Sequence, residues 1–363
     1  MNKKDVIQSE CIKAINNKHR AGVILGTGTG KTLLGLKHMI TKYTDTSLFL
    51  VVAPKLSIHQ EWLSQAKEHG LDYLIPHMQF VTYLSLIKLN YNYDYVYLDE
   101  CHNLKYHHGD WLRLYNGPIL GMTGSYPKPR SEESFNVCSE FCPVVYKYDI
   151  DQGIKDNILN DYKIYVHMLE LSKNRTVKTK GGGFVSEVDN YRMWSRYIET
   201  AKGQQEMINR VMRMKAMQGY QTKVKYAKRL LEQQTEKTLV FTDYTEQADL
   251  ICEHVYHSKE PKSKENLDLF KSGKISKLSS VLQIAEGANI PNLKVGIIMH
   301  AYANEKKLKQ KIGRFLRLNP SEKSIVHLLC YKDTIDLKWC KQALKDFEPS
   351  KIFKYNGKVS SIQ

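Results

Sequence analysis

The stretch LGTGTGKT, residues 25–32, decides the fold of this chain. It follows the apolar run GVIL, which begins at Gly22, and it opens the amphipathic segment KTLLGLKHMITKY. A glycine-rich loop between a strand and a helix binds phosphate, because glycines let backbone N–H groups approach the oxygens and the helix start is electropositive. The stretch therefore predicts an α/β fold with a nucleoside triphosphate site.

The residues of the loop have predicted roles in binding the nucleotide and its metal ion. Lys31 is expected to reach the β- and γ-phosphates of ATP, and the Thr32 hydroxyl to ligate Mg²⁺. Leu25 stands where the general pattern has glycine, but the strand–loop–helix context is intact. Further contacts to the nucleotide are predicted at Gly26, Thr27, Gly28, Thr29 and Gly30.

A pair of carboxylates is the second half of this predicted site. The string YVYLDECHN ends an apolar run with Asp99 and Glu100. A carboxylate at the carboxyl end of a strand beside the phosphate loop is where Mg²⁺ is held, so Asp99 is the predicted metal ligand. Glu100 is predicted to orient and deprotonate the attacking water.

The rest of the chain repeats the alternation of strands and helices. Apolar runs LFLVVA, MQFVTY and YVYLD follow in the first part, and a second series, YKIYVHMLEL, TLVFTD, LSSVLQ, VGIIMH and SIVHLLCY, begins near Tyr162. This order predicts two parallel sheets flanked by helices, in domains 1–150 and 151–363 joined by a polar linker at about residues 149–160. The second domain carries a basic stretch at about residues 172–235, and its string KNRTVKTKGGG is predicted to be a mobile loop.

Composition restricts the partners. The 54 Lys and Arg against 38 Asp and Glu give a net charge of +16, which favours a polyanion, although solubility alone would also explain it. The seven cysteines are scattered without zinc-ligand spacing and are interpreted as reduced thiols of a cytosolic protein. The N-terminus MNKKDVIQSE is not a signal peptide, and no run of 18 apolar residues exists, so neither secretion nor a membrane partner is expected.

With these residues in place, the chain resembles the superfamily 2 helicases and translocases. LGTGTGKT resembles their first motif, DECH the second, MTGSYPK the third, and TLVFTDYTEQAD, IAEGANIPNLKVGIIMH and QKIGRFLRL the fourth to sixth. The resemblance implies two tandem RecA-like domains with an ATP cleft between them, and ATP with Mg²⁺ as cofactors. The third motif departs from the family at Ser125 and Tyr126, which weakens the coupling role expected at Ser125 relative to Thr123.

The resemblance also assigns residues. Gln8 corresponds to the glutamine that reads adenine, Gly287 is a further nucleotide contact, and Arg317 and Arg314, with Gln310, are the arginine finger and its neighbours. Contacts with the nucleic-acid backbone are implied at Pro54, Lys55, Thr82, Tyr83, Thr123 and Thr242.

Within the superfamily, the string VVYKYDIDQGIKDNILNDYKIYV resembles the restriction-motor, XPB and UvsW types, and DECHNLKYHHGDWLRLYNGPILGMTG resembles Swi/Snf remodellers. These branches act on duplex or branched DNA, so DNA is favoured over RNA. The chain has little beyond the two-domain core, which suggests a minimal or phage-encoded member that acts in the cytoplasm, at the nucleoid or, if viral, in the host cytoplasm.

Three alternatives stay open. The first is an RNA helicase of the same superfamily, although the motif spellings favour DNA. The second is a basic clamp on nucleic acid whose ATPase has decayed, against which the full set of motif residues argues. The third is a motor subunit for a separate nuclease, since no nuclease motif is visible in the chain.

Overall fold

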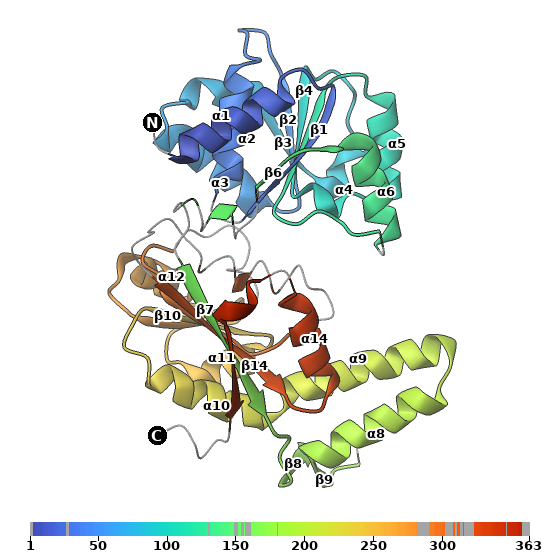
Figure 1. Ribbon diagram of the computed structural model, residues 1–363, viewed down its shortest axis with the longest axis vertical. Helices are drawn as coiled ribbons and strands as arrows, with labels where there is room; N and C mark the ends of the chain where they lie inside the picture. The colour runs from blue at the N-terminus through green and yellow to red at the C-terminus, as the bar shows by residue number, and fades with distance from the viewer. Residues whose placement is uncertain are drawn as a thin grey trace. The chain divides into compact units, whose positions relative to one another are not determined.

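The computed structural model describes residues 3–26, 29–129, 131–148, 152–153, 156, 161–179, 181–281, 290–301, 308, 311–312, 315, 323–345 and 347–357. The chain divides into two compact units, of which the first runs to Asp161 and the second starts at Tyr162 (Figure 1). None of the helices in the described ranges is both long and apolar enough to cross a membrane.

The first unit is a parallel sheet with helices on both faces. Its elements are α1 (Lys3–Ile15), β1 (Arg20–Leu25), α2 (Lys31–Ile40), β2 (Phe49–Ala53), α3 (Leu56–Glu68), η1 (Asp72–His77), β3 (Met78–Thr82), α4 (Tyr83–Leu86), β4 (Tyr95–Asp99), η2 (Cys101–Asn103), α5 (Tyr106–Leu114), β5 (Ile119–Thr123), α6 (Glu132–Phe141) and β6 (Val144–Tyr148). The strand order is β3-β2-β4-β5-β1-β6, and all five pairings are parallel. The predicted strands are β1 to β4, whereas β5 and β6 were not predicted.

Alternating side chains of the strands pack against different helices. In β4, Tyr95 and Tyr97 join the cluster that includes side chains of α1, α2 and α3. Val96 and Leu98 point to the opposite face and join the cluster with α4, α5 and α6. Because β4 is covered on both faces, the carboxylates that follow it are held at the sheet's carboxyl edge on a rigid support.

The second unit has a seven-stranded sheet. Its elements are β7 (Asp161–Leu169), β8 (Arg175–Lys178), β9 (Phe184–Ser186), α8 (Glu187–Thr200), α9 (Gly203–Gly219), α10 (Gln221–Glu232), β10 (Thr238–Thr242), α11 (Thr245–Ile251), β11 (Val255–Tyr256), α12 (Ser263–Ser272), β12 (Lys277–Val281), β13 (Val295–Ile298), β14 (Lys323–Tyr331), α14 (Ile335–Ala343), η4 (Pro349–Lys351) and β15 (Ile352–Gly357). The order is β11-β12-β10-β13-β14-β7-β15, with parallel pairing of β11–β12, β12–β10, β10–β13, β13–β14 and β7–β15. All five predicted strands are present, and the two edge strands, β11 and β15, were not predicted.

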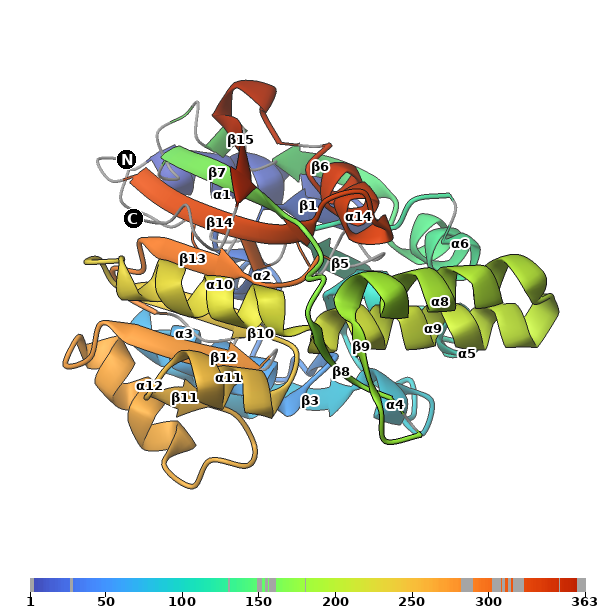
Figure 2. The same cartoon turned by 90° about the horizontal axis from the view of Figure 1, so that it is seen from below.

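The basic string KNRTVKTKGGG was wrongly predicted to be a loop. Its residues Arg175–Lys178 form β8, which pairs antiparallel with β9. Gly182 has φ +83°, a left-handed conformation that glycine adopts without strain, and it lies in the turn that joins the two strands. After this β-hairpin, α8 and α9 form a helical hairpin that extends away from the sheet of its unit (Figures 1 and 2).

Candidate ATP site

The phosphate loop joins β1 to α2 in the first unit. The Thr29 hydroxyl donates to the Gly26 carbonyl oxygen at 2.7 Å, which tightens the loop. Gly30 precedes the helix with φ 87°, a left-handed conformation that costs a residue with a Cβ about 1–2 kcal/mol. The N-cap residue Gly30 has no side chain to cap α2, so, as far as the described residues go, the backbone N–H groups of the first turn are available to an anion.

Gln8 of α1 lies against this loop. It is 2% exposed, and its Nε2 donates to the Gly30 carbonyl oxygen at 3.4 Å. Its Oε1 is buried without a hydrogen-bond partner among the described residues. A buried acceptor without a partner is costly, and a ligand that donates a hydrogen bond there, such as an adenine amino group, would remove that cost.

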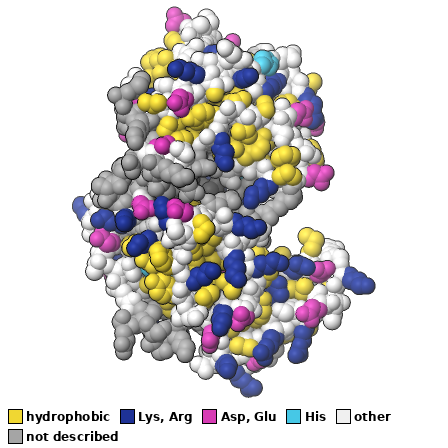
Figure 3. All heavy atoms as spheres, viewed as in Figure 1, with side chains coloured by type: hydrophobic (Ala, Val, Ile, Leu, Met, Phe, Trp, Pro, Cys, Tyr) yellow, Lys and Arg dark blue, Asp and Glu magenta, His cyan; other side chains and the backbone are white. Residues whose placement is uncertain are grey.

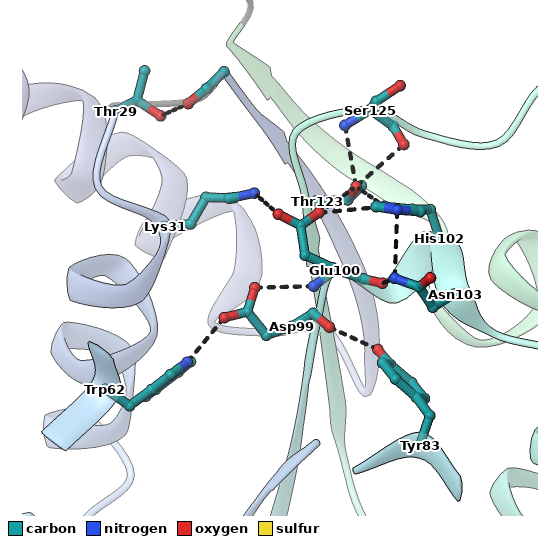
Figure 4. Close-up of polar contacts among 11 residues, drawn as sticks. Thr29, Lys31, Trp62, Tyr83, Asp99, Glu100, His102, Asn103, Thr123 and Ser125 are labelled. Carbon is teal, nitrogen blue, oxygen red and sulfur yellow. Dashed lines mark hydrogen bonds and ion pairs between the residues drawn. The ribbon is translucent and has the colours of Figure 1, made fainter. Parts of the chain in front are cut away.

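Asp99 ends β4 and is 4% exposed. The indole Nε1 of Trp62 donates to its Oδ2 at 2.9 Å, and the backbone N–H of Glu100 donates to its Oδ1 at 2.9 Å. The Tyr83 hydroxyl donates to the Asp99 carbonyl oxygen at 2.9 Å (Figure 4). Both the backbone and the carboxylate of Asp99 are therefore held in place.

Glu100 is the centre of the polar network in Figure 4. Its backbone has φ 50° and ψ 51°, a left-handed conformation that is strained for a residue with a Cβ and that occurs often at functional sites. Its carboxylate forms an ion pair with Lys31, accepts from the Thr123 hydroxyl at 3.4 Å, and lies 3.3 Å from Nδ1 of His102. The same His102 nitrogen is 2.8 Å from the Thr123 hydroxyl.

The two neighbouring carboxylates have different acidities. Burial raises the pKa of Asp99 to about 6, with the Lys31 charge opposing this and the Glu100 charge adding to it. Burial also acts to raise the pKa of Glu100, but the Lys31 ammonium and the hydrogen bond from His102 outweigh it, and the pKa falls well below its usual range. Glu100 is therefore ionised at neutral pH, as a proton acceptor must be.

The donors present fit a magnesium ion. Thr32 and Asp99 are 9% and 4% exposed, and a hydroxyl with a carboxylate is the oxygen donor set that Mg²⁺ takes when it is also bound to phosphates. Among the described residues no group of three His, Cys, Asp or Glu could hold a metal by itself. The geometry matches a metal that arrives with a nucleotide and not a closed protein site.

Several supporting residues were missed by the sequence argument. Trp62 reaches Asp99 because Gly35 of α2 lies directly beneath its ring: a Cβ at Gly35 would lie 2.3 Å from the ring atom Cη2. Asn103 donates to the Glu100 carbonyl oxygen at 2.9 Å. The sequence signal for Trp62 was its place on the apolar face of a helical pattern, because a buried indole N–H needs a hydrogen-bond acceptor.

Three of the six predicted nucleic-acid contacts lie below the surface. Tyr83, Thr123 and Thr242 are 5%, 0% and 0% exposed, and their hydroxyls form hydrogen bonds inside their own units. Because they are buried, these three side chains do not lie at a surface where they could contact nucleic acid directly. Pro54 and Thr82 are half-buried and Lys55 is exposed.

Further predicted site residues lie outside the described residues. They are Thr27, Gly28, Gly287, Gln310, Arg314 and Arg317. Their roles stay predictions. Within the basic stretch at about residues 172–235, Lys223 of α10 is 1% exposed and forms an ion pair with Asp336 at 2.5 Å, so this cation is a buried structural residue.

Two family models match separate parts of the chain, one near its start and one in its second half. The model described as type III restriction enzyme, res subunit, matches residues 3–88, and the model described as helicase conserved C-terminal domain matches residues 222–319. A curated relative, the DNA 3'-5' translocase XPB2 of Sulfurisphaera tokodaii, is 22% identical over 91% of this chain and 82% of its own length. This chain belongs to superfamily 2 of the helicases and translocases. The predicted enzyme class of that superfamily, a nucleic-acid-dependent ATPase, is thereby confirmed.

Solved structures of this superfamily share the fold. The type ISP restriction–modification enzyme LlaBIII bound to DNA is similar with a TM-score of 0.62 at 13% identity, over 98% of this chain; the chain spans only 31% of that enzyme. Dbp5 of S. cerevisiae bound to RNA and ADP BeF3 has a TM-score of 0.61 at 11% identity, over 96% of this chain and 89% of its own. The predicted fold class, two parallel sheets flanked by helices as in tandem RecA-like domains, is confirmed.

Proposed function

We propose that this chain is an ATP-driven translocase that acts on duplex or branched DNA. The observation that carries the proposal is the network around Glu100, which joins the phosphate loop through Lys31 to the third-motif segment through Thr123. A proton acceptor tied to both segments can make the chemical step depend on the segment that superfamily members use for coupling. A motor needs such a link between hydrolysis and movement, whereas a clamp that does not move needs none.

The chemical roles follow from the contacts. The uncapped start of α2 offers its N–H groups to the phosphates, and Thr32 and Asp99 would hold Mg²⁺. The ion, when bound, neutralises charge on the phosphate oxygens. Lys31 exchanges its ion pair with Glu100 for the γ-phosphate, and the released Glu100 carboxylate accepts the proton of the attacking water.

His102 and Thr123 keep the released carboxylate in position. Both contact the carboxylate oxygen Oε2, whereas Lys31 contacts Oε1. Loss of the Lys31 contact therefore leaves Glu100 oriented by two other groups. The second unit would add Arg314 and Arg317, whose motif spacing assigns them to the charge that develops on the γ-phosphoryl group.

DNA is the proposed track for two reasons. The relative from Sulfurisphaera tokodaii is named a DNA translocase, and the similarity extends over most of both chains. The net charge of +16 suits a phosphate-tracking surface, and the affinity should fall steeply with salt. A cytoplasmic location and a phage origin stay predictions that accompany this proposal.

The decisive experiment measures steady-state ATP hydrolysis with no nucleic acid, single-stranded DNA, duplex DNA, a four-way junction and RNA. Glu100→Gln keeps the size of the side chain and removes the proton acceptor, so it should abolish turnover while ATP binding remains. Glu253→Gln, at an exposed site in the second unit, is the matched control and should leave all rates unchanged. Displacement of a triplex-forming strand from duplex DNA then tests movement itself.

The outcomes separate the candidates. Stimulation by duplex or junction, lost in Glu100→Gln, with triplex displacement, supports the proposal. Stimulation by RNA alone would assign the chain to RNA helicases. Salt-sensitive DNA binding without hydrolysis would leave only the clamp.

A further inference from the structure

The helical hairpin of α8 and α9 has almost no core of its own. Across residues 187–219, all of which are described, only Glu187, Asn190, Asn209 and Met217 are buried. The two helices contact each other, and the hairpin extends away from the sheet in both views (Figures 1 and 2). Several apolar side chains along it are consequently exposed to solvent.

These apolar side chains are strongly exposed. The exposed fractions are 69% for Met207, 48% for Tyr197, 46% for Ile208 and 45% for Val211. Single exposed apolar residues are common, but neighbours one helical turn apart, such as Met207 and Val211, make a continuous patch, and patches of this kind mark interaction sites.

A groove runs between the two helices. It has a volume of about 590 Å³, and Trp194 and Tyr197 of α8 and Ile208 and Met212 of α9 line it. The other lining side chains belong to Thr, Ala, Gln and Asn, so no charged residue lines the groove. The α8 residues of the lining, from Trp194 to Thr200, span about two helical turns, or about 10 Å.

Positive charge surrounds this uncharged groove. The exposed cations of the hairpin are Arg192, Arg196, Lys202, Arg210 and Lys215, and its exposed anions are Asp189 and Glu199. The adjoining β8–β9 hairpin, which contacts α8, adds exposed Lys173, Arg175 and Lys178. Figure 3 shows hydrophobic side chains lying between Lys and Arg side chains on the visible face of the hairpin.

We propose that this groove binds an amphipathic helix of a partner protein whose apolar stripe is flanked by Asp and Glu. The occupant is apolar where it meets Trp194 and Ile208, because burying charge against uncharged walls is costly. It is acidic at its edges, because the surrounding cations attract carboxylates and repel Lys and Arg. Methionines, which adapt to different side chains, suit such a surface.

The competing occupants fit less well. Bases of a single strand could stack on Trp194 and Tyr197 beside the cations, but they would leave the aliphatic side chains of the groove and the adjacent exposed Met207 and Val211 without an apolar partner. A second copy of this chain would bring the same excess of positive charge to the contact. An acidic helix satisfies both the apolar walls and the charged surroundings.

The test uses the full chain and two synthetic helical peptides of about 18 residues, each with Leu at positions i, i+3, i+4 and i+7. One peptide carries Glu at the remaining positions and the other carries Lys. Binding is followed by tryptophan fluorescence, with Trp194→Phe to identify the signal from the groove. The acidic peptide should bind at least about tenfold more tightly than the basic one.

Two variants make the result specific. Ile208→Glu puts a carboxylate at the groove and should weaken the acidic peptide by about tenfold or more, while Leu250→Glu, an equally exposed site on α11 at 52%, should not. Reversal of Arg192, Arg196 and Lys202 to Glu should switch the preference to the basic peptide. Circular dichroism of each variant, and Ile208→Ala as a milder change, separate loss of binding from loss of folding.

Each other outcome overturns the proposal. Equal binding of both peptides, or no binding, would mean that no acidic helix is selected. If Ile208→Glu lowers DNA-stimulated ATP hydrolysis, the groove serves DNA. If sedimentation shows a dimer that Ile208→Glu dissociates, the groove binds a second copy. Because hydrolysis with DNA is measured separately, failure of this proposal is distinguishable from failure of the translocase function.

Discussion

Replacing Trp62 by Phe isolates one hydrogen bond to the acidic pair. The indole Nε1 donates to Asp99 Oδ2 at 2.9 Å, and both side chains are buried. Phe keeps an aromatic ring against Gly35 but leaves one carboxylate oxygen without its donor. A hydrogen bond to a charged group contributes about 1.5–3 kcal/mol, and the first unit should lose stability of that size.

The same loss should also lower the rate of ATP hydrolysis, because Asp99 is the predicted Mg²⁺ ligand. If all of it appeared in the transition state, kcat/KM would fall by about 10- to 150-fold, since 1.36 kcal/mol corresponds to a factor of ten. We expect a fall within that limit, together with a higher Mg²⁺ concentration for half-maximal hydrolysis. The assays are DNA-stimulated ATP hydrolysis across a Mg²⁺ titration and urea unfolding.

Trp111→Phe is the matched control. Trp111 is also buried in the first unit, but its Nε1 donates at 3.0 Å to a neutral acceptor, the Leu89 carbonyl oxygen, and not to the acidic pair. Trp111→Phe should lower the free energy of unfolding by about 0.5–1.5 kcal/mol and leave kcat/KM unchanged. Equal kcat/KM values for the two variants would refute the reasoning that Trp62 supports the metal site.

Three further predictions concern stability. Gly35→Ala should cost about 1–3 kcal/mol by overpacking against the Trp62 ring, and it should lower hydrolysis as Trp62→Phe does; unchanged urea midpoints would contradict it. Lys223→Met should cost about 3–5 kcal/mol because Asp336 stays buried without its partner, and adding Asp336→Leu should recover most of that loss in urea unfolding. Burial lowers the pKa of His167 to about 4 and that of His327 to about 3, so both are neutral when folded. Their contribution is fully present above the unfolded pKa of about 6.5 and is lost as pH falls below it, by up to about 2 kcal/mol each between pH 7 and pH 5. Burial also lowers the pKa of His38, His108 and His300, so His327→Gln should reduce the slope of unfolding titrations by the share of one histidine and leave the rest.

Local pattern was enough for most of the strands. The runs that became β1 to β4, β10 and β14 are mainly apolar, so their type could be predicted without knowing their neighbours. β5, with the sequence ILGMT, is buried along its whole length, but a glycine interrupts its short apolar run. β15, with four exposed residues, has no apolar run and depends on pairing with β7. The string KNRTVKTKGGG was predicted to be a loop because it is polar and contains no apolar run, although part of it forms a strand of a β-hairpin.

The sequence by itself determined the chemistry of the ATP site. A phosphate loop and an acidic pair are short strings whose tasks follow from their residue types and from the strand before each of them, and Lys31 and Glu100 form an ion pair. Only the tertiary structure decided what holds them, namely the indole of Trp62, the left-handed backbone of Glu100, and the buried hydroxyls of Tyr83 and Thr123. Those contacts join residues distant in the chain, and only the packing of helices on the sheet brings them within hydrogen-bond distance.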